Sequence, residues 1–142
     1  MRKRRERQEA IRRIVRGERV RTQRALVERL EQEGFDCTQA TVSRDITEMG
    51  LRKLPEGVYV LAEDLHLQRM VSDLVKGVGR SGNLVLVKAQ SGTAPGVAAA
   101  LDAAELDGIL GSVSGDDTIL VVMDNEPAGK RLMETLDKFR GA

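Results

Sequence analysis

The sequence has few aromatic residues and almost no cysteine or histidine. Phe35, Tyr59 and Phe139 are the only Phe, Tyr or Trp among 142 residues, so any core must be built from aliphatic side chains. The single cysteine, Cys37, cannot form an intrachain disulfide, which argues against secretion. With His66 as the only histidine, no Ser-His-Asp or Cys-His arrangement can be proposed convincingly, and we expect no enzyme.

A long hydrophobic run is also missing. No apolar stretch approaches the roughly 18 residues that a membrane helix needs. The basic amino terminus is followed by further charge instead of an apolar region, which excludes a signal peptide. These absences predict a soluble, cytoplasmic protein that does not contact a membrane.

Charge, by contrast, is abundant and unevenly divided along the chain. Residues 1–62 contain 15 Lys and Arg against 10 Asp and Glu, whereas residues 63–142 contain 8 against 12. The excess is greatest in residues 1–24, with 11 basic against 3 acidic side chains. Such asymmetry indicates a polyanionic partner for the basic half. We therefore expect two domains, at 1–62 and 74–142, joined by a linker helix at 63–73.

Three helices and a β-hairpin are predicted in the first domain. A first helix ends at Gly17, and a second begins at the N-cap Thr22 and ends at Gly34. A third helix begins at Thr38 and ends at Gly50, and "LRKLPEGVYVL" then reads as two short strands around a turn. This order predicts a winged helix-turn-helix, a fold that binds DNA.

The third helix, in the stretch "TQATVSRDITEMG", has an apolar side and a polar side. Val42, Ile46 and Met49 form a stripe at helical spacing. In a helix-turn-helix this helix lies in the major groove, where Arg can contact guanine and Gln can contact adenine. The residues expected to contact double-stranded DNA are Gln39, Thr41, Ser43 and Arg44. The basic residues near the amino terminus would add attraction to phosphates. Periodicity alone also fits a solvated amphipathic helix.

The second domain is predicted to be a small α+β sandwich. Its elements follow the order β-β-α-β-β-α, which indicates an antiparallel sheet with helices on one face. The first two strands are expected at 74–79 and 83–90, around a turn at Ser81 and Gly82. A domain of about 75 residues is marginal alone, and we therefore expect this half to oligomerise.

Gly115, Asp116 and Asp117 form the most chemically distinctive motif of the second domain. Gly-Asp between two apolar strands is ordinary hairpin chemistry. Two adjacent carboxylates at a turn also favour a guanidinium or ammonium ligand, and Asp102 near the end of the preceding helix could add a third acceptor. A Mg²⁺ site is a further reading, although no other acidic cluster has ligand spacing.

Stretches in both halves resemble the bacterial arginine repressors. "TQATVSRDI" is similar to their recognition-helix signature, and "SGTAPGVAAALD" and "ILGSVSGDDTILVV" are similar to their C-terminal effector domain. The resemblance implies that Ser43 and Arg44 lie at the DNA with Gln39 close by, and Gln23 in the matched stretch completes the expected contacts. It implies L-arginine as corepressor, with no other cofactor. The matched ligand residues are Asp102, Ser112, Ser114, Asp116 and Asp117.

The resemblance also implies how such a protein acts. Trimers of the second domain would stack into a hexamer that binds palindromic operator DNA, represses arginine biosynthesis genes and sometimes activates catabolic genes. Pro95 departs from the family pattern, because relatives often carry a polar side chain there, and Ser112 replaces a commoner Thr. Three alternatives stay open: a same-fold regulator with another ligand, an architectural DNA-binding protein, and a small metal-dependent hydrolase using Asp116 and Asp117.

Overall fold

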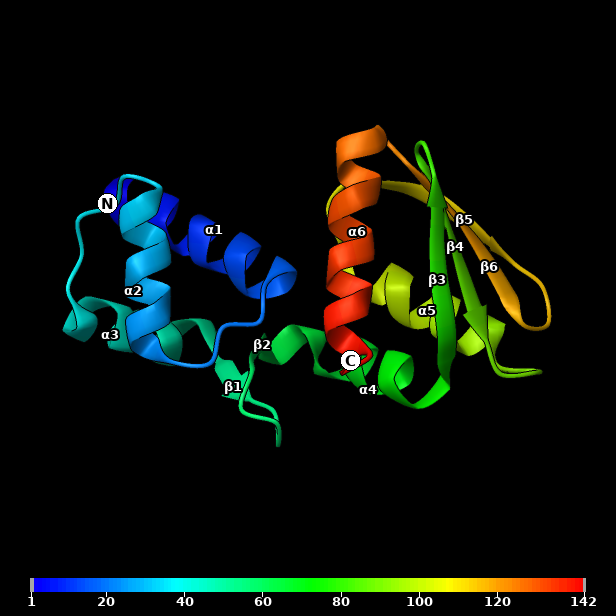
Figure 1. Ribbon diagram of the computed structural model, residues 1–142, viewed down its shortest axis with the longest axis horizontal. Helices are drawn as coiled ribbons and strands as arrows, with labels where there is room; N and C mark the ends of the chain where they lie inside the picture. Colours follow the sequence, from blue (N-terminus) through cyan, green and yellow to red (C-terminus); the bar gives the residue numbers. More distant parts are fainter. Residues whose placement is uncertain (1, 142) are drawn as a thin grey trace. The chain divides into compact units, whose positions relative to one another are not determined.

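The computed structural model describes residues 2–141 of the chain. Contacts between residues divide it into two units, Met1–Ala62 and Glu63–Ala142 (Figure 1). Each unit encloses its own set of buried apolar side chains. Within this described part, no helix is both long enough and apolar enough to cross a membrane.

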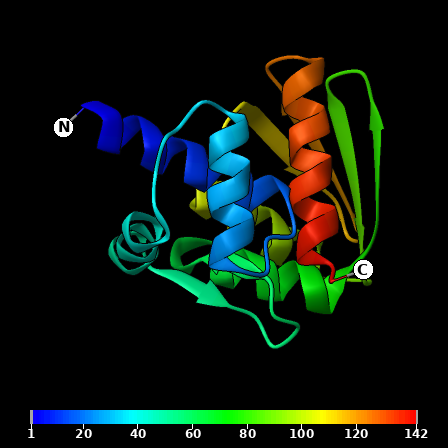
Figure 2. The same cartoon turned by 60° about the vertical axis from the view of Figure 1, so that its left-hand side comes forward.

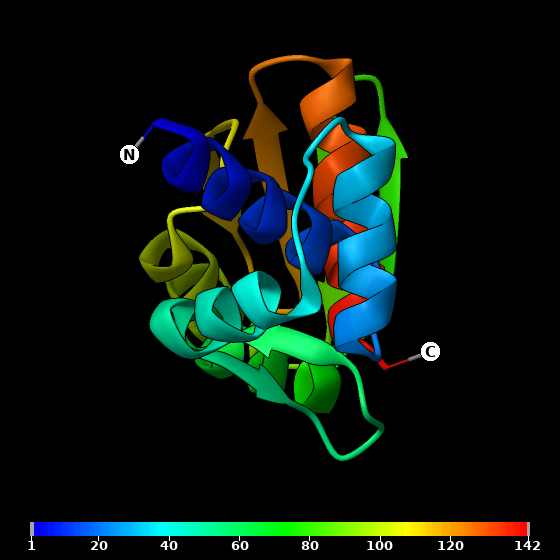
Figure 3. The same cartoon turned by 90° about the vertical axis from the view of Figure 1, so that its left-hand side faces the viewer.

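The first unit consists of three helices followed by a β-hairpin. Its elements are α1 (Arg2–Gly17), α2 (Gln23–Gln32), α3 (Gln39–Met49), β1 (Leu51–Lys53) and β2 (Tyr59–Leu61). The two strands pair antiparallel, with Leu51 opposite Leu61, and the hairpin leaves the end of α3 (Figure 3). The predicted winged helix-turn-helix is therefore confirmed.

Polar side chains and a glycine set the ends of the helix-turn-helix. The Thr22 hydroxyl accepts a hydrogen bond of 3.0 Å from the Ala25 N–H, and the Thr38 hydroxyl accepts one of 3.2 Å from the Thr41 N–H. Both satisfy donors that the first turn of a helix leaves free. Gly50 ends α3 with a φ of +68°, a left-handed conformation that glycine adopts without steric cost. The predicted N-caps of α2 and α3 are confirmed.

The apolar sides of the three helices and the wing meet in one core. Val42 of α3 is fully buried, while Ile46 and Met49 are partly buried against the same cluster. Other buried members include Ile11 and Ile14 of α1, Leu26 and Leu30 of α2, and Leu61 of β2. The apolar stripe predicted for α3 thus faces the core, and its polar side is left for solvent.

The second unit consists of a four-stranded sheet and three main helices. A short 3₁₀ turn at the unit boundary (Ala62–Asp64) precedes α4 (Leu65–Leu74), β3 (Val75–Ser81), β4 (Leu84–Ala89), α5 (Ala94–Ala104), β5 (Ile109–Ser114), β6 (Thr118–Met123) and α6 (Glu126–Phe139). The strand order is β3-β4-β6-β5, and all neighbours are antiparallel. The predicted α+β class is confirmed. The helix expected across 63–73 is α4, which packs against α5 and α6.

The first hairpin of the sheet differs from the prediction by two residues. Strand β3 continues through Arg80 and Ser81, which lie opposite Val85 and Leu84. The loop therefore begins at Gly82 and not at Ser81. Gly82 has a φ of +58°, so this residue can start a tight two-residue loop that lets the strand run further.

The sheet has one covered face and one open face. Val85 and Val87 of β4 are buried beneath the helices, and α6 lies along this face in Figure 2. On the other face Leu86 pairs across with Leu120, and Leu120 pairs with Val113. Among residues 2–141, the large apolar side chains that are exposed are Leu84, Leu86, Leu120, Val113 (71% exposed) and Leu110 (67% exposed). Leu110 lies at an irregularity of the edge strand β5 and has no partner in the register. We call the other four residues the open apolar face.

Candidate nucleic-acid interface and effector site

Three polar side chains of α3 are open to solvent and have no hydrogen-bond partner within the described part of the protein. Gln39 and Arg44 are exposed and Ser43 is partly exposed. Within residues 2–141, the side chains of these three residues make no hydrogen bond or ion pair. A guanidinium and an amide without internal partners can bond base edges or phosphates of a bound duplex.

Thr41 and Gln23 have different surroundings. The Thr41 hydroxyl lies 3.0 Å from the Thr38 hydroxyl, so Thr41 belongs to the N-terminal cap of α3. Gln23 is the first residue of α2 and is partly exposed, on a different helix from Arg44. The structure thus groups Gln39, Ser43 and Arg44 on one helix surface and places the other two expected DNA contacts at helix N-termini.

Several arginines near the amino terminus are paired with carboxylates of the same unit. The pairs are Arg4 with Glu48, Arg7 with Asp45 and Arg13 with Glu33. Lys3, Arg21 and Arg44 are exposed and have no partner in the part of the chain that the structure describes. Attraction to phosphates by this stretch is therefore weaker than its composition indicates, because part of its charge is neutralised internally.

Asp45, which sequence reasoning did not single out, is a buried carboxylate directly after Arg44. It is 2% exposed and accepts hydrogen bonds from Arg7 Nε (2.5 Å), Arg7 Nη2 (3.0 Å) and Gln8 Nε2 (2.9 Å). Burial raises the pKa of this carboxyl, but the hydrogen bonds and the charge of Arg7 outweigh it and hold the pKa below its ordinary value. The role of Asp45 is hard to recognise in the sequence, because its partners Arg7 and Gln8 lie 38 and 37 positions away.

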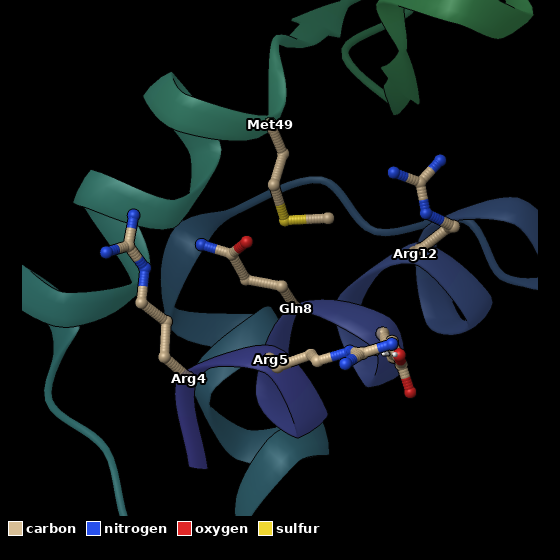
Figure 4. A pocket seen from close by; sticks show the side chains of 6 residues that line it. Arg4, Arg5, Gln8, Arg12 and Met49 are labelled. Atoms are coloured by element: carbon tan, nitrogen blue, oxygen red, sulfur yellow. Dashed lines mark ion pairs between the residues drawn. The ribbon is translucent and has the colours of Figure 1, made fainter. Parts of the chain in front are cut away.

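A shallow hollow lies where α1 passes the end of α3. Its volume is about 510 Å³, and it is lined by Arg4, Arg5, Gln8, Glu9 and Arg12 of α1 and by Met49 of α3 (Figure 4). Arg5 is paired with Glu9, and Gln8 donates to Asp45. The lining therefore overlaps the contacts that join α1 to α3.

In the second unit, Asp116 and Asp117 form the turn between β5 and β6 and are exposed. Ser91 Oγ donates to Asp116 Oδ2 at 3.0 Å. Thr118 Oγ1 donates to Asp117 Oδ1 at 2.9 Å and accepts from Lys88 Nζ at 2.8 Å. Each carboxylate thus has a donor of its own. Among residues 2–141, no three His, Cys, Asp or Glu side chains form a group that could hold a metal ion.

The backbone of this turn is tied to the rest of the unit. The carbonyl of Asp116 accepts from the Ala94 N–H at 3.1 Å, and the carbonyl of Asp117 accepts from the Ala89 N–H at 2.7 Å. The Thr118 hydrogen bond, followed by the charge of Lys88, lowers the pKa of Asp117. The turn therefore holds a charged carboxylate at a fixed position. A hairpin loop without these hydrogen bonds would not fix the carboxylate in this way.

The remaining expected ligand residues lie on β5 and α5. Ser112 and Ser114 are opposite Val121 and Ile119, which are buried beneath the helices, so both serines project toward the helix-covered face. Strand β5 is at the edge of the sheet and leads directly into the Asp116 turn. Asp102 is exposed on α5, and its carboxylate makes no hydrogen bond within the described residues.

Both units match the same family of known proteins. Residues 2–67 match the family model "Arginine repressor, DNA binding domain", and residues 71–138 match "Arginine repressor, C-terminal domain". An arginine repressor of Thermus thermophilus is 48% identical over 147 residues, which covers 96% of this chain and 88% of that protein. One from Carboxydothermus hydrogenoformans is 38% identical over 144 residues, covering 94% and 96% respectively. With both halves matched in order, the chain belongs to the arginine repressor family, a family of transcription regulators and not of enzymes.

Proposed function

We propose that this protein is an L-arginine-dependent transcriptional repressor that binds palindromic operator DNA of arginine biosynthesis genes. The observation that supports this most directly is the match of the two halves, in order, to the DNA-binding and C-terminal domains of arginine repressors. The proposal extends to catabolic genes, which the same protein would activate.

On the DNA side, α3 enters the major groove and reads bases with the side chains of Gln39, Ser43 and Arg44. Support comes from their exposure and from their freedom from internal partners. Gln23 and Thr41 lie in the first turns of α2 and α3, where backbone N–H groups favour a phosphate. We assign these two to the DNA backbone.

On the effector side, the guanidinium of L-arginine binds the carboxylates of Asp116 and Asp117. A guanidinium matches several acceptors in one plane, and charge-assisted hydrogen bonds are about twice as strong as neutral ones. The lowered pKa of Asp117 keeps this group ionised at neutral pH. Asp102 supplies a further acceptor, and the hydroxyls of Ser112 and Ser114 complete the proposed site.

The open apolar face supports assembly of several copies. A row that includes Leu86, Leu120 and Val113 is uncovered in the single chain. Soluble monomers rarely expose a contiguous apolar patch of this kind, whereas oligomers cover it with other copies. In the proposal three copies meet through this face, and L-arginine joins two trimers. The hexamer then presents several α3 helices to one operator and gains affinity by effective concentration.

The test is operator binding measured by fluorescence anisotropy at fixed salt, with and without L-arginine. The probe is an AT-rich palindromic duplex, and L-citrulline is the uncharged control. We expect L-arginine to tighten binding and citrulline to leave it unchanged. DNA should tighten L-arginine binding by the same factor, because coupling is reciprocal. Equal binding under all three conditions would contradict the proposal and favour an architectural protein.

A further inference from the structure

The recognition helix α3 is joined to α1 by a cluster of polar contacts around a buried carboxylate. Both oxygens of Asp45 are bonded by the guanidinium of Arg7, and Gln8 adds a third hydrogen bond. We call Arg7, Gln8 and Asp45 the α1–α3 clamp. One turn further along α3, Glu48 bonds Gln8 and Arg4. All of these contacts lie within the first unit.

The clamp acts at the residue next to the exposed arginine. Asp45 is 2% exposed, whereas Arg44 is exposed and has no internal partner in the described chain. Consecutive residues of an α-helix point about 100° apart around its axis. A carboxylate held against α1 therefore also determines where the side chain of Arg44 points.

The apolar contacts of α3 do not provide this directional control. Val42, Ile46 and Met49 pack against the core through apolar surface, and such contacts depend little on direction. A bidentate pair between Arg and a carboxylate has a fixed planar geometry. The apolar stripe sets which side of α3 faces the core, and the clamp, together with the Glu48 contacts beside it, fixes the finer rotation of α3 about its axis.

We propose that the α1–α3 clamp is a positioning device for base readout, so that Asp45 and Arg7 determine operator selectivity without contacting DNA. This rests on the proposed DNA-binding function of α3. With the clamp broken, α3 stays packed through its apolar stripe but no longer holds Arg44 in one orientation. Contacts to phosphates tolerate such a change, whereas contacts to base edges do not.

The test uses a double variant of the full chain, Arg7→Met with Asp45→Asn. Changing both partners avoids leaving one charge of the pair without its counter-ion, which would by itself destabilise the domain. The matched control is Glu18→Gln with Arg29→Met. In that pair Arg29 Nε lies 2.8 Å from Glu18 Oε1 and Arg29 Nη2 lies 2.6 Å from Glu18 Oε2, and α3 takes no part.

Two duplexes serve as probes, each measured by fluorescence anisotropy at fixed salt. One is a duplex that the wild-type protein enriches from a randomised pool, and the other is a scrambled duplex of the same composition. We expect the clamp variant to keep its affinity for the scrambled duplex within about twofold, because phosphate contacts persist. Its preference for the enriched duplex should fall by about tenfold or more, because base contacts are misplaced, and we expect the same fall for Arg44→Ala, which removes a base contact outright. The control should keep the wild-type preference.

Two results would overturn the inference. One is an unchanged preference in the clamp variant, and the other is an equal loss in the clamp variant and the control. Failure of the proposed function gives a different result, because the wild-type protein would then enrich no duplex at all, and the inference would fall with it. If circular dichroism shows that the double variant is unfolded, the single variant Arg7→Lys is tested in its place. Lysine keeps the positive charge but cannot form the planar bidentate pair of a guanidinium. The fold should therefore persist while the preference for the enriched duplex drops.

Discussion

At the scale of single residues, the carboxylates of this chain have two contrasting environments. Asp45 is buried and accepts three hydrogen bonds, out of about four that a carboxylate can accept. Asp116 and Asp117 are exposed, and each side chain accepts one side-chain hydrogen bond. The carboxylate of Asp45 has little acceptor capacity left, and its hydrogen bonds join α3 to α1. The other two have acceptor capacity left for a ligand.

Asp116→Asn should weaken the response to L-arginine while DNA binding without arginine persists. The amide keeps the size of the side chain but removes one of the two charges that we propose to bind the guanidinium, and charge-assisted hydrogen bonds contribute about 1.5–3 kcal/mol. Titration calorimetry with L-arginine and operator anisotropy are the measurements. Asp107→Asn, at another exposed carboxylate of the second unit, is the control. An unchanged arginine response in Asp116→Asn would return this segment to the role of a plain hairpin turn.

The lowered pKa of Asp45 makes the first unit sensitive to acid. Its folded pKa lies below the ordinary value of 3.8, so the charged carboxylate stabilises the fold fully above that pH. The contribution is lost as the pH falls through the folded pKa. At neutral pH, Asp45→Asn should lower the free energy of unfolding by about 1–3 kcal/mol. The difference in the free energy of unfolding between wild type and variant should shrink as the pH falls below 3.8.

Urea denaturation of the wild type and of Asp45→Asn across this pH range measures the effect. Asp36→Asn is the control, because Asp36 is exposed and has no ion pair within the described residues. A deficit that stays constant from neutral to acid pH would mean that the ionised carboxylate is not the source of the stability.

At the scale of elements, helix ends and the order of helices and strands along the chain could be predicted from the sequence because their signals are local. Thr38 and Gly50 bound α3 through contacts within a few residues, and the prediction of both ends holds. The wing hairpin also follows from local patterning. Such features depend on backbone groups near in sequence, so the local sequence is enough to place them.

Features that depend on distant partners could not be predicted. The burial of Asp45 depends on Arg7, which is 38 positions away, and no local pattern marks that pair. Strand β4 is rich in apolar residues and central in the sheet, yet Leu84 and Leu86 lie on an uncovered face. The sequence does not tell which face of an apolar strand the helices cover. For Asp102, the structure adds only that its carboxylate is exposed on α5.

Gly50→Ala should destabilise the first unit, because alanine is strained at the φ of +68° that ends α3. The cost of a left-handed conformation for a residue with a Cβ is about 1–2 kcal/mol. Thermal unfolding should therefore begin several degrees lower. Gly50→Asn is the matched comparison and should lose less stability than Gly50→Ala, since asparagine tolerates this conformation. Equal stability of wild type and Gly50→Ala would show that the end of α3 adopts another conformation in solution.

At the scale of the whole molecule, the open apolar face should control assembly without controlling the fold of the chain. Leu86 is 41% exposed, so Leu86→Lys buries no charge within the single chain. We expect this variant to remain folded but to sediment as a smaller species, with weaker operator binding because fewer α3 helices act together. Analytical ultracentrifugation and circular dichroism measure the two properties.

The control for this prediction is Arg131→Glu, a charge change at an exposed position of α6 on the helix side of the sheet. It should leave the sedimentation of the protein unchanged. Wild-type sedimentation of Leu86→Lys would exclude the open apolar face as the contact between copies.

The open apolar face also has a consequence for how expression level translates into repression. On the proposed assembly, a chain hides Leu86 and Val113 only after it meets other copies, so the assembled fraction follows mass action. Active repressor then rises more steeply than linearly with the number of chains in the cell. Halving the gene dosage would more than halve the assembled pool, and a cell could tune repression by synthesis of this protein as well as by its arginine level.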